Sequence, residues 1–449
     1  MQKATHLSEI AGALNKFEPV PPDHPFYVDF SGLRGSFAID RLYKMLNVRK
    51  VNKNGETFWE HTPLGAKTFI FLAGMRGSGK TTELLRYARE LEGPSAFLCV
   101  VCNVDGDLDM PDLEYMDVLI YQLEKLIERV GEKNVQLDED IVEAMQTWFA
   151  NQVEEINKRL RAEGEIEISA GNKEGYSLWK LLLSTVLGIR TTLSGSLDRA
   201  THVRKVMRNN FSDFATRFNE FIEKTVLLLQ KKKITKDILF IVDGLEKTMT
   251  AEVRKRMVID GANQIRSIKV HTIFTLPVEL TAEANRIKNF AEILIFPFIK
   301  VQTRDGQDVP ESVNRFLEFI DRRISAELFD SEEVKRKAIL LSGGSPRQLL
   351  RILEHASWEV AEGACIDEEA LQKAVEYLSN EMARFIREEQ FEELRKIEEA
   401  RKSGIFVPFN DCMQDLMEQE IVFEYDDGTY KDVNPLVAAS KAYKTHVLQ

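Results

Sequence analysis

The sequence has few cysteines, no long apolar run and no excess of positive charge. Its four cysteines are Cys99, Cys102, Cys365 and Cys412, too few and too scattered for a disulfide framework. No apolar run approaches the roughly 18 residues of a membrane span. The N-terminal residues also lack the apolar stretch and cleavage site of a secretory signal. We therefore expect a cytoplasmic protein without a membrane segment.

The charge balance narrows the class of partners. Asp and Glu number 72 against 60 Lys and Arg, which gives a net charge of −12. Such a balance argues against a surface that binds nucleic acid throughout, but it leaves room for a local basic patch. No Ser-His-Asp, metal-ligand or nuclease constellation is present in the sequence. At 449 residues the chain is long enough for two to four domains.

Cys99 and Cys102 form a C-x-x-C pair, which occurs in redox and metal sites. The flanking residues, "SAFLCVVCNVDG", have the pattern of a buried strand, in which positions three apart point to opposite faces. No second Cys/His pair completes a zinc site. We therefore interpret both cysteines as strand residues.

Short apolar segments alternate with helical patterns along the first two thirds of the chain. This alternation predicts a parallel sheet covered by helices on both faces. A helix is expected from Thr81 to Leu91, where Gly93 and Pro94 end it. The expected strands are residues 68–73, 96–101, 237–247, 270–277 and 292–298.

The spacing of these elements suggests four parts. Residues 1–67 form an irregular lead-in, and residues 68–300 form the sheet with its helices. The stretch of about 110–236 is longer than one crossover needs, so we interpret it as a helical insertion, interrupted by a loop at 163–175. Residues 301–403 have helical patterns, and residues 404–449 predict a helix followed by a hairpin that turns at Asp427-Gly428.

The stretch from Gly74 to Thr81 fits the phosphate-loop pattern G-x-x-x-x-G-K-[ST]. Its glycines let backbone N–H groups point at a phosphate, and the helix that follows adds its positive N-terminal end. Lys80 is expected to reach the β- and γ-phosphates, and the hydroxyl of Thr81 to bind Mg²⁺. The nucleotide-binding residues expected here are Gly74, Arg76, Gly77, Ser78, Gly79, Lys80, Thr81 and Thr82.

An acidic residue at the end of another predicted strand complements the phosphate loop. The apolar run "ILFIVD" ends in Asp243. An ionised carboxylate at the end of a buried strand is costly unless a cation compensates its charge. We therefore predict that Asp243 and Thr81 hold Mg²⁺, although Asp243 could instead cap the turn that follows.

The order of four motifs resembles the AAA+ and STAND group of P-loop ATPases. These are the phosphate loop, "DILFIVDGLEK", "VHTIFTLP" and "LSGGSPRQLLRIL", and the likeness is strongest to the origin-recognition-like and NACHT-like branches. The resemblance covers about residues 26–360. It implies an α/β P-loop NTPase sheet with a helical lid, a small C-terminal winged-helix-like domain, and ATP and Mg²⁺ as ligands.

The resemblance also implies roles for single residues. Thr275, or less well Thr272, would sense the γ-phosphate from the end of the fourth strand. In the lid motif Pro346 would lie against the adenine and Arg347 would approach the γ-phosphate. The segment "SGLRG" is similar to the adenine-side motif, so Arg34 and Gly35 would line the base pocket.

One position departs from the family pattern. Many AAA+ ATPases have a Glu directly after the metal-binding Asp, where it acts as the base for the attacking water. Here Gly244 follows Asp243, and the next acidic residue is Glu246. Hydrolysis would then be slow, or would rest on Glu246, and the nucleotide would act more as a switch than as a source of energy. Candidate arginine fingers toward a neighbouring site are Arg254, Arg256 and Arg286.

Two functions are compatible with these features. The first is an ATP-dependent switch that controls self-assembly or a partner protein, which the resemblance links to prokaryotic antiviral defence or signalling. The second is a DNA-acting AAA+ ATPase, such as a loader or a transposition regulator, and its basic surface would lie in residues 190–210. The acidic C-terminal helix and hairpin favour the first, because such a surface repels phosphates. A small-molecule kinase is disfavoured by the lid motif and the chain length.

Overall fold

The computed structural model describes residues 2–15, 18–34, 36–63, 65–108, 110–135, 137–162, 177–195, 197–245, 250–257, 261–283 and 291–449. The loop that we predicted at 163–175 lies outside these ranges, as do Gly35, Glu246 and Arg286. Within them, no helix is both long and apolar enough to cross a membrane.

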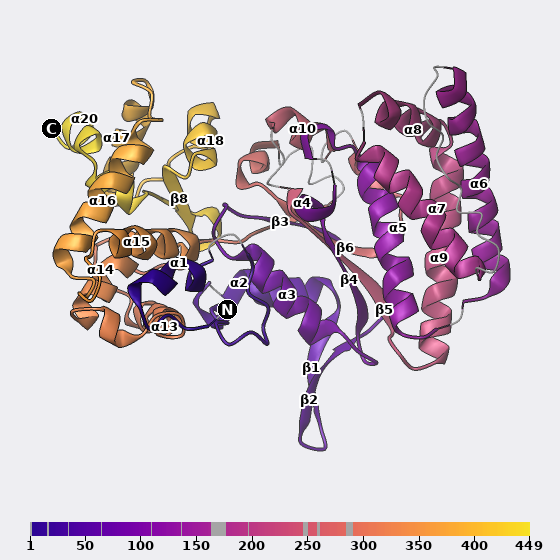
Figure 1. Ribbon diagram of the computed structural model, residues 1–449, viewed down its shortest axis with the longest axis horizontal. Coiled ribbons are helices and arrows are strands. Elements are labelled where there is room, and N and C mark those ends of the chain that lie inside the picture. The colour runs from indigo at the N-terminus through magenta and orange to yellow at the C-terminus, as the bar shows by residue number, and fades with distance from the viewer. Residues whose placement is uncertain are drawn as a thin grey trace.

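A five-stranded parallel sheet forms the centre of the molecule (Figure 1). Its order is β4-β5-β6-β3-β7, and these neighbours pair in parallel. The predicted parallel sheet is therefore confirmed, with the last strand three residues shorter than expected. The strands are β3 (Phe69–Ala73), β4 (Phe97–Asn103), β5 (Asp237–Asp243), β6 (His271–Leu276) and β7 (Glu292–Ile295).

Helices cover both faces of this sheet, because its strands are apolar on both sides. Alternate residues of β3, such as Ile70 and Leu72, pack with α2 and α3, while Phe71 and Ala73 pack toward the helices on the other face. Cys99 and Cys102 belong to these two opposite cores, and both are free thiols, as the strand interpretation requires. The first face is covered by α2 (Ser36–Met45) and α3 (Lys80–Leu91).

The opposite face carries the long helices that we predicted between the second and third strands (Figure 1). Their buried side chains share one core with that face of the sheet. The helices are α5 (Tyr115–Glu132), α6 (Glu139–Ala162), α7 (Leu178–Leu193), α8 (Leu197–Asn209) and α9 (Phe211–Lys231). Shorter pieces at the sheet edges are α4 (Val104–Asp107), η3 (Met110–Asp112), α10 (Ala251–Lys255), α11 (Ala262–Arg266) and η6 (Val278–Glu283).

The lead-in contains a β-hairpin that we did not predict. β1 (Val48–Lys53) and β2 (Glu56–His61) pair antiparallel and project from the body of the molecule (Figure 1). Asn54 and Gly55 connect them with φ values of 55° and 83°, as a type I′ turn requires. The ring of Trp59 stacks on Tyr43 of α2 at 3.9 Å and attaches the hairpin to the sheet domain.

The C-terminal third is a helical body, as predicted, that shares one apolar core with the start of the chain. Ile10 and Phe30 are buried in this core together with residues of α13 to α16. The pieces from the start of the chain are η1 (Leu7–Glu9), α1 (Ile10–Ala13) and η2 (Ser31–Leu33). The helices are α13 (Pro310–Asp321), η7 (Ala326–Leu328), α14 (Glu332–Leu341), α15 (Pro346–Trp358) and α16 (Glu368–Ala383).

The expected C-terminal helix and hairpin are present and join the same core. The short 3-10 helix η8 (Asp426–Gly428) forms the hairpin turn where the Asp-Gly pair was expected. Tyr425 donates its hydroxyl to the carbonyl of Gly343 at 2.7 Å, so the hairpin is fastened to the loop before α15. These elements are α17 (Gln390–Ser403), α18 (Asp411–Glu418), β8 (Val422–Tyr425), β9 (Tyr430–Val433), α19 (Pro435–Ala439) and α20 (Lys441–His446).

Candidate functional site

The phosphate loop connects β3, in the interior of the sheet, to the N-terminus of α3. Gly77 and Gly79 have φ values of 74° and 92°, a left-handed conformation that side chains disfavour. At Gly74 a Cβ would lie 2.7 Å from the carbonyl oxygen of Phe296, so this position is closed to larger residues. The ammonium of Lys80 donates to the carbonyls of Gly74 and Met75 at 2.8 and 2.9 Å, which holds the loop in its curled form.

Arg34 braces this loop from the lead-in. Its guanidinium donates to the carbonyl of Ser78 at 2.5 Å and to that of Pro297 at 2.8 Å, and it lies 4.2 Å from the ring of Phe296. Burial lowers the pKa of Arg34 to about 10, so the group stays charged at neutral pH. Arg34 lines the cavity described below, and its hydrogen bonds tie the phosphate loop to the end of β7; its expected place at the adenine stays a prediction.

The strand ends bring two more predicted residues together. Asp243 ends β5 and is almost fully buried, and Thr275 lies near the end of β6. Because β6 separates β5 from β3, Thr275 stands between Asp243 and the phosphate-loop strand. Its hydroxyl accepts the N–H of Gly244 at 3.1 Å. Thr272 lies toward the other end of β6 and donates to the carbonyl of Val270, so of the two threonines only Thr275 lies at the strand end beside Asp243; the sensor role stays a prediction.

A cavity of about 400 Å³ opens over the phosphate loop. We call it the loop cavity. Three segments that are far apart in the sequence form most of its walls: the lead-in, the loop with the start of α3, and the helical body at α13 and α15. Asp105, just after β4, also lines it. Its cationic lining residues are Arg34, Arg76, Lys80, Arg323 and Arg347, and its apolar lining residues include Pro19, Val20, Phe26, Val28, Phe319, Pro346 and Leu350.

The start of α15 approaches the phosphate loop closely. A Cβ at Gly77 would lie 3.0 Å from the Cβ of Arg347 and 3.3 Å from the hydroxyl of Ser345. At Gly344, where φ is 77°, a Cβ would lie 1.6 Å from the carbonyl oxygen of Ile299. The motif that includes Pro346 and Arg347 therefore lies beside the phosphate loop, where Gly77 leaves space for the contact. The roles expected for Pro346 at the adenine and Arg347 at the γ-phosphate stay predictions.

The hairpin region adds a carboxylate that sequence reasoning missed. Glu420 follows α18 with a φ of 58°, a conformation that is uncommon outside glycine. Asn434 donates to the backbone carbonyl of Glu420 and exchanges two hydrogen bonds with Gln348, the neighbour of Arg347. Burial raises the pKa of Glu420, and the charges of Arg347, Arg76, Arg351 and Lys80 oppose this rise. An acidic group from the C-terminal region is thus near enough to feel the charge of these cations, although it does not line the loop cavity itself.

Two other lining residues were not predicted. Asp105 lies just after β4, and Arg323 follows α13. The guanidinium of Arg323 lies 3.7 Å from the ring of Phe319 and donates to the Phe319 carbonyl, and burial lowers its pKa to about 9. Asp105 follows the carboxyl end of a predicted strand, and this position could have identified it as a candidate site residue. Nothing in the sequence marks Arg323 in this way.

The structure provides little evidence on the three candidate arginine fingers. Arg256 pairs with Asp112 at 3.1 Å, within its own chain. The side chain of Arg254 and the whole of Arg286 lie outside the described residues. The three assignments stay predictions.

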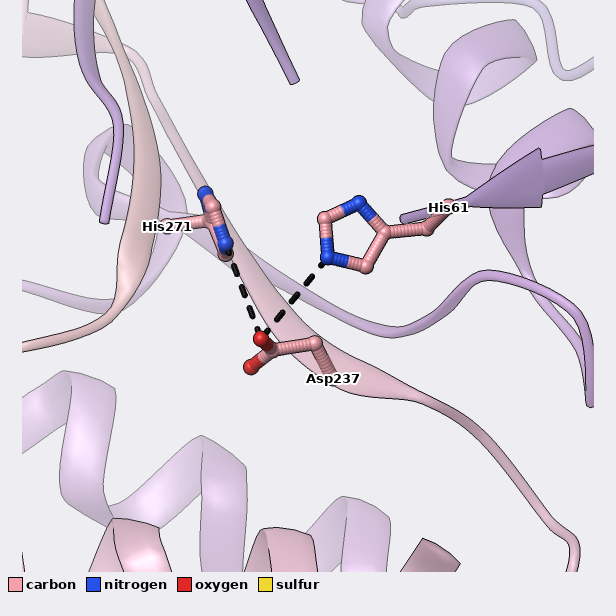
Figure 2. A group of neighbouring side chains, drawn as sticks. All are labelled: His61, Asp237 and His271. Atoms are coloured by element: carbon pink, nitrogen blue, oxygen red, sulfur yellow. Dashed lines mark ion pairs between the residues drawn. The ribbon is translucent and has the colours of Figure 1, made fainter. Parts of the chain in front are cut away.

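A second polar cluster lies at the opposite end of the sheet, where His61, Asp237 and His271 meet (Figure 2). Asp237 begins β5, His271 begins β6, and His61 ends β2. All three side chains are buried, and Asp237 Oδ2 lies 3.8 Å from His61 Nε2 and 3.6 Å from His271 Nε2. Two imidazoles and a carboxylate are donors that suit a transition metal.

Two contacts argue against a metal at this cluster. The ammonium of Lys67 lies 2.5 Å from Asp237 Oδ2 and already supplies a cation. The N–H of Thr68 donates to His271 Nδ1 at 3.1 Å, so neutral His271 carries its proton on Nε2, the atom that would have to bind the metal. We therefore interpret the cluster as a polar anchor that fastens the hairpin to β5 and β6.

The sheet, the covering helices and the phosphate loop together fit a P-loop NTPase fold. No family model and no curated protein matches the chain. Among solved structures, the Walker-type ATPase of Pyrococcus abyssi is similar over 97% of this chain and 100% of that one, with 13% identity and a TM-score of 0.44. A likeness of this degree adds nothing to the assignment, which rests on the residues of the loop and on the topology of the sheet.

Proposed function

We propose that the chain binds ATP with Mg²⁺ in the loop cavity and hydrolyses it slowly, as an ATPase of the AAA+/STAND type. The observation that carries the proposal is the loop cavity itself. One end is the phosphate loop with Lys80 and Thr81, and apolar residues of the lead-in and the helical body form other walls. A nucleotide has the matching chemistry, because its phosphates are anionic and its base is flat and apolar on both faces.

The donor set fits Mg²⁺. Thr81 supplies a hydroxyl on the cavity wall and Asp243 a carboxylate at the end of β5, and hard oxygen donors are what this ion prefers. Bound Mg²⁺ would neutralise charge on the phosphates. In this chain Lys80 would bind the β- and γ-phosphates, and Thr275, which accepts the N–H of Gly244, would orient groups at the γ-phosphate end.

The proposed role is that of a nucleotide-dependent switch. The walls of the loop cavity belong to both the sheet domain and the helical body, so a bound triphosphate would touch both. Arg347 at the start of α15 would read the γ-phosphate, and the position of the helical body would then control self-assembly or a partner protein. Antiviral defence or signalling in prokaryotes is the setting that the family resemblance suggests for such a switch.

Titration with a fluorescent ATP analogue tests the proposal. Lys80→Ala should abolish binding, because it removes the cation at the phosphates, while Lys373→Ala on the exposed surface of α16 should bind as wild type does. Glu246→Gln should keep binding, because Glu246 was predicted to act on the attacking water and not on the bound phosphates. The rate at which this variant releases phosphate tests that predicted role. A Lys80→Ala variant that binds ATP as tightly as wild type would contradict the proposal.

The alternative of a DNA-acting ATPase lacks support from its one basic stretch. Three arginines of residues 190–210 are used inside the chain: Arg190 pairs with Glu124, Arg204 with Asp117, and Arg208 lies 3.8 Å from Glu114. We therefore expect no salt-dependent binding of duplex DNA by the full chain. A mobility shift that weakens as salt rises would favour the alternative.

A further inference from the structure

The residue after Asp243 is a glycine because no side chain fits there. Gly244 has a φ of 98°, and a Cβ at this position would lie 2.9 Å from the backbone nitrogen of Asp105 and 3.0 Å from its Cβ. The space that a glutamate side chain would enter is therefore filled by the chain segment of Asp105. This packing explains why the acidic residue expected after Asp243 is missing.

The topology of the sheet brings Asp105 to this place. β4 is the neighbour of β5, and Asn103 at the end of β4 is the register partner of Asp243. The short helix α4 begins at the next residue, and its fully buried Val104 packs into the core beneath the sheet. Asp105 is consequently held at the sheet edge, exposed to solvent, where it lines the loop cavity with Lys80 and Thr81.

We propose that Asp105 is the general base of the hydrolysis reaction. The inference rests on the proposed function, since it assigns a residue to the reaction of the loop cavity. The oxygen of a water molecule forms a bond to the γ-phosphorus while the bond from that phosphorus to the β,γ-bridging oxygen breaks. The carboxylate of Asp105 accepts the proton of the attacking water, and the bridging oxygen leaves with the electron pair on ADP.

The chemistry of the site supports this assignment. A general base must reach the attacking water from the side of the γ-phosphate, and Asp105 shares one cavity wall with the loop that binds the phosphates. The backbone nitrogen and Cβ of Asp105 lie beside Gly244, the residue after Asp243, but Asp105 follows a different strand, so the proposal gives metal binding and proton transfer to separate groups.

Single-turnover hydrolysis of radiolabelled ATP, with nucleotide affinity measured in parallel, tests the proposal. Asp105→Asn should lower the hydrolysis rate about 100-fold or more while affinity stays within about twofold of wild type. Asp107→Asn is the matched control, because Asp107 lies in the same short helix but accepts the hydroxyl of Tyr121 and does not line the cavity. Asp105→Glu should recover part of the rate.

Three results would overturn the assignment. They are a normal rate in Asp105→Asn, an equal loss in Asp107→Asn, or a rate of Asp105→Asn that excess Mg²⁺ restores, which would make the residue a metal ligand. A loss of hydrolysis in Glu246→Gln with normal turnover in Asp105→Asn would return the role to Glu246. If wild type binds no nucleotide, or binds ATP and never cleaves it, the proposed function fails; if wild type cleaves ATP and Asp105→Asn cleaves it equally fast, only the role of Asp105 fails.

Discussion

Replacement of Arg347 by alanine should narrow the affinity gap between ATP and ADP. The Arg347 Cβ and Cδ lie 3.0 and 3.4 Å from the position of a Cβ at Gly77, so the guanidinium is close to any phosphate held by the loop. At a separation of about 6 Å and an effective dielectric constant of about 20, the guanidinium attracts one unit of phosphate charge by about 3 kcal/mol. Competition with solvent and side-chain entropy remove roughly half of this, and the remainder of about 1.4 kcal/mol corresponds to about tenfold in affinity.

Calorimetric titration of wild type and Arg347→Ala with both nucleotides measures this effect. ATP affinity should fall about tenfold, and ADP affinity should change much less, because ADP lacks the γ-phosphate. Arg351→Ala is a useful control, since Arg351 lies one turn further along α15 and pairs with Glu381. An equal loss for ATP and ADP, or no loss, would refute the placement of Arg347 at the γ-phosphate.

Three further predictions follow from the geometry. Glu420→Gln should raise the ATP affinity measured by calorimetry several-fold, the opposite of the effect expected for Arg347→Ala, because it removes an anion near the cavity cations. Glu399→Gln, at an exposed position, is the control and should leave the affinity unchanged. Gly344→Ala should cost about 2–4 kcal/mol in urea unfolding, whereas Gly363→Ala, with nothing within 4 Å of its Cβ position, should cost about 1. Burial, and to a lesser extent the charge of His271, lowers the pKa of His61 from 6.5 to about 4. As the pH falls, the unfolded chain therefore binds a proton at His61 before the folded chain does. Unfolding free energy should therefore fall by about 3 kcal/mol from pH 6.5 to 4, and His61→Gln should flatten this decline.

The sheet could be predicted because its strands are short apolar runs between strong helical patterns. The phosphate loop could be predicted because its glycines and Lys80 serve one chemistry in one local order. The hairpin of the lead-in was equally readable, since Asn54-Gly55 is a strong signal for a two-residue turn. We missed it because polar residues occupy most of both strands, which leaves little apolar alternation to notice.

The walls of the loop cavity could not be predicted, because they depend on packing between distant segments. Arg323 is an ordinary arginine after a helix in the sequence, and only the folded chain brings it to the lead-in and the phosphate loop. Glu420 likewise reads as one of many C-terminal acids. Its place near the cations of the phosphate loop depends on hydrogen bonds between Asn434 and Gln348, two residues that lie 86 positions apart in the sequence.

The contacts between the loop and the C-terminal hairpin pass through one short segment, residues 343–347. Gly77 meets Arg347 and Ser345, Gly344 lies against the carbonyl of Ile299, and a Cβ at Gly343 would touch Phe423 and Pro435 at 3.0 and 2.9 Å. Glycine has no flexible side chain that could adjust to a displacement. Because the backbones are in close contact at these positions, we expect a displacement of one segment to displace its neighbour as well. On the proposed function, a shift of the phosphate loop on nucleotide binding should move Arg347, and with it the hairpin that Tyr425 fastens to Gly343. The same contacts work in reverse, because a partner that pulls on the hairpin would change the space available at Gly77. If the proposed switch operates, we therefore expect the close approach of these backbones, more than any single ion pair, to couple the C-terminal region to the occupant of the loop cavity.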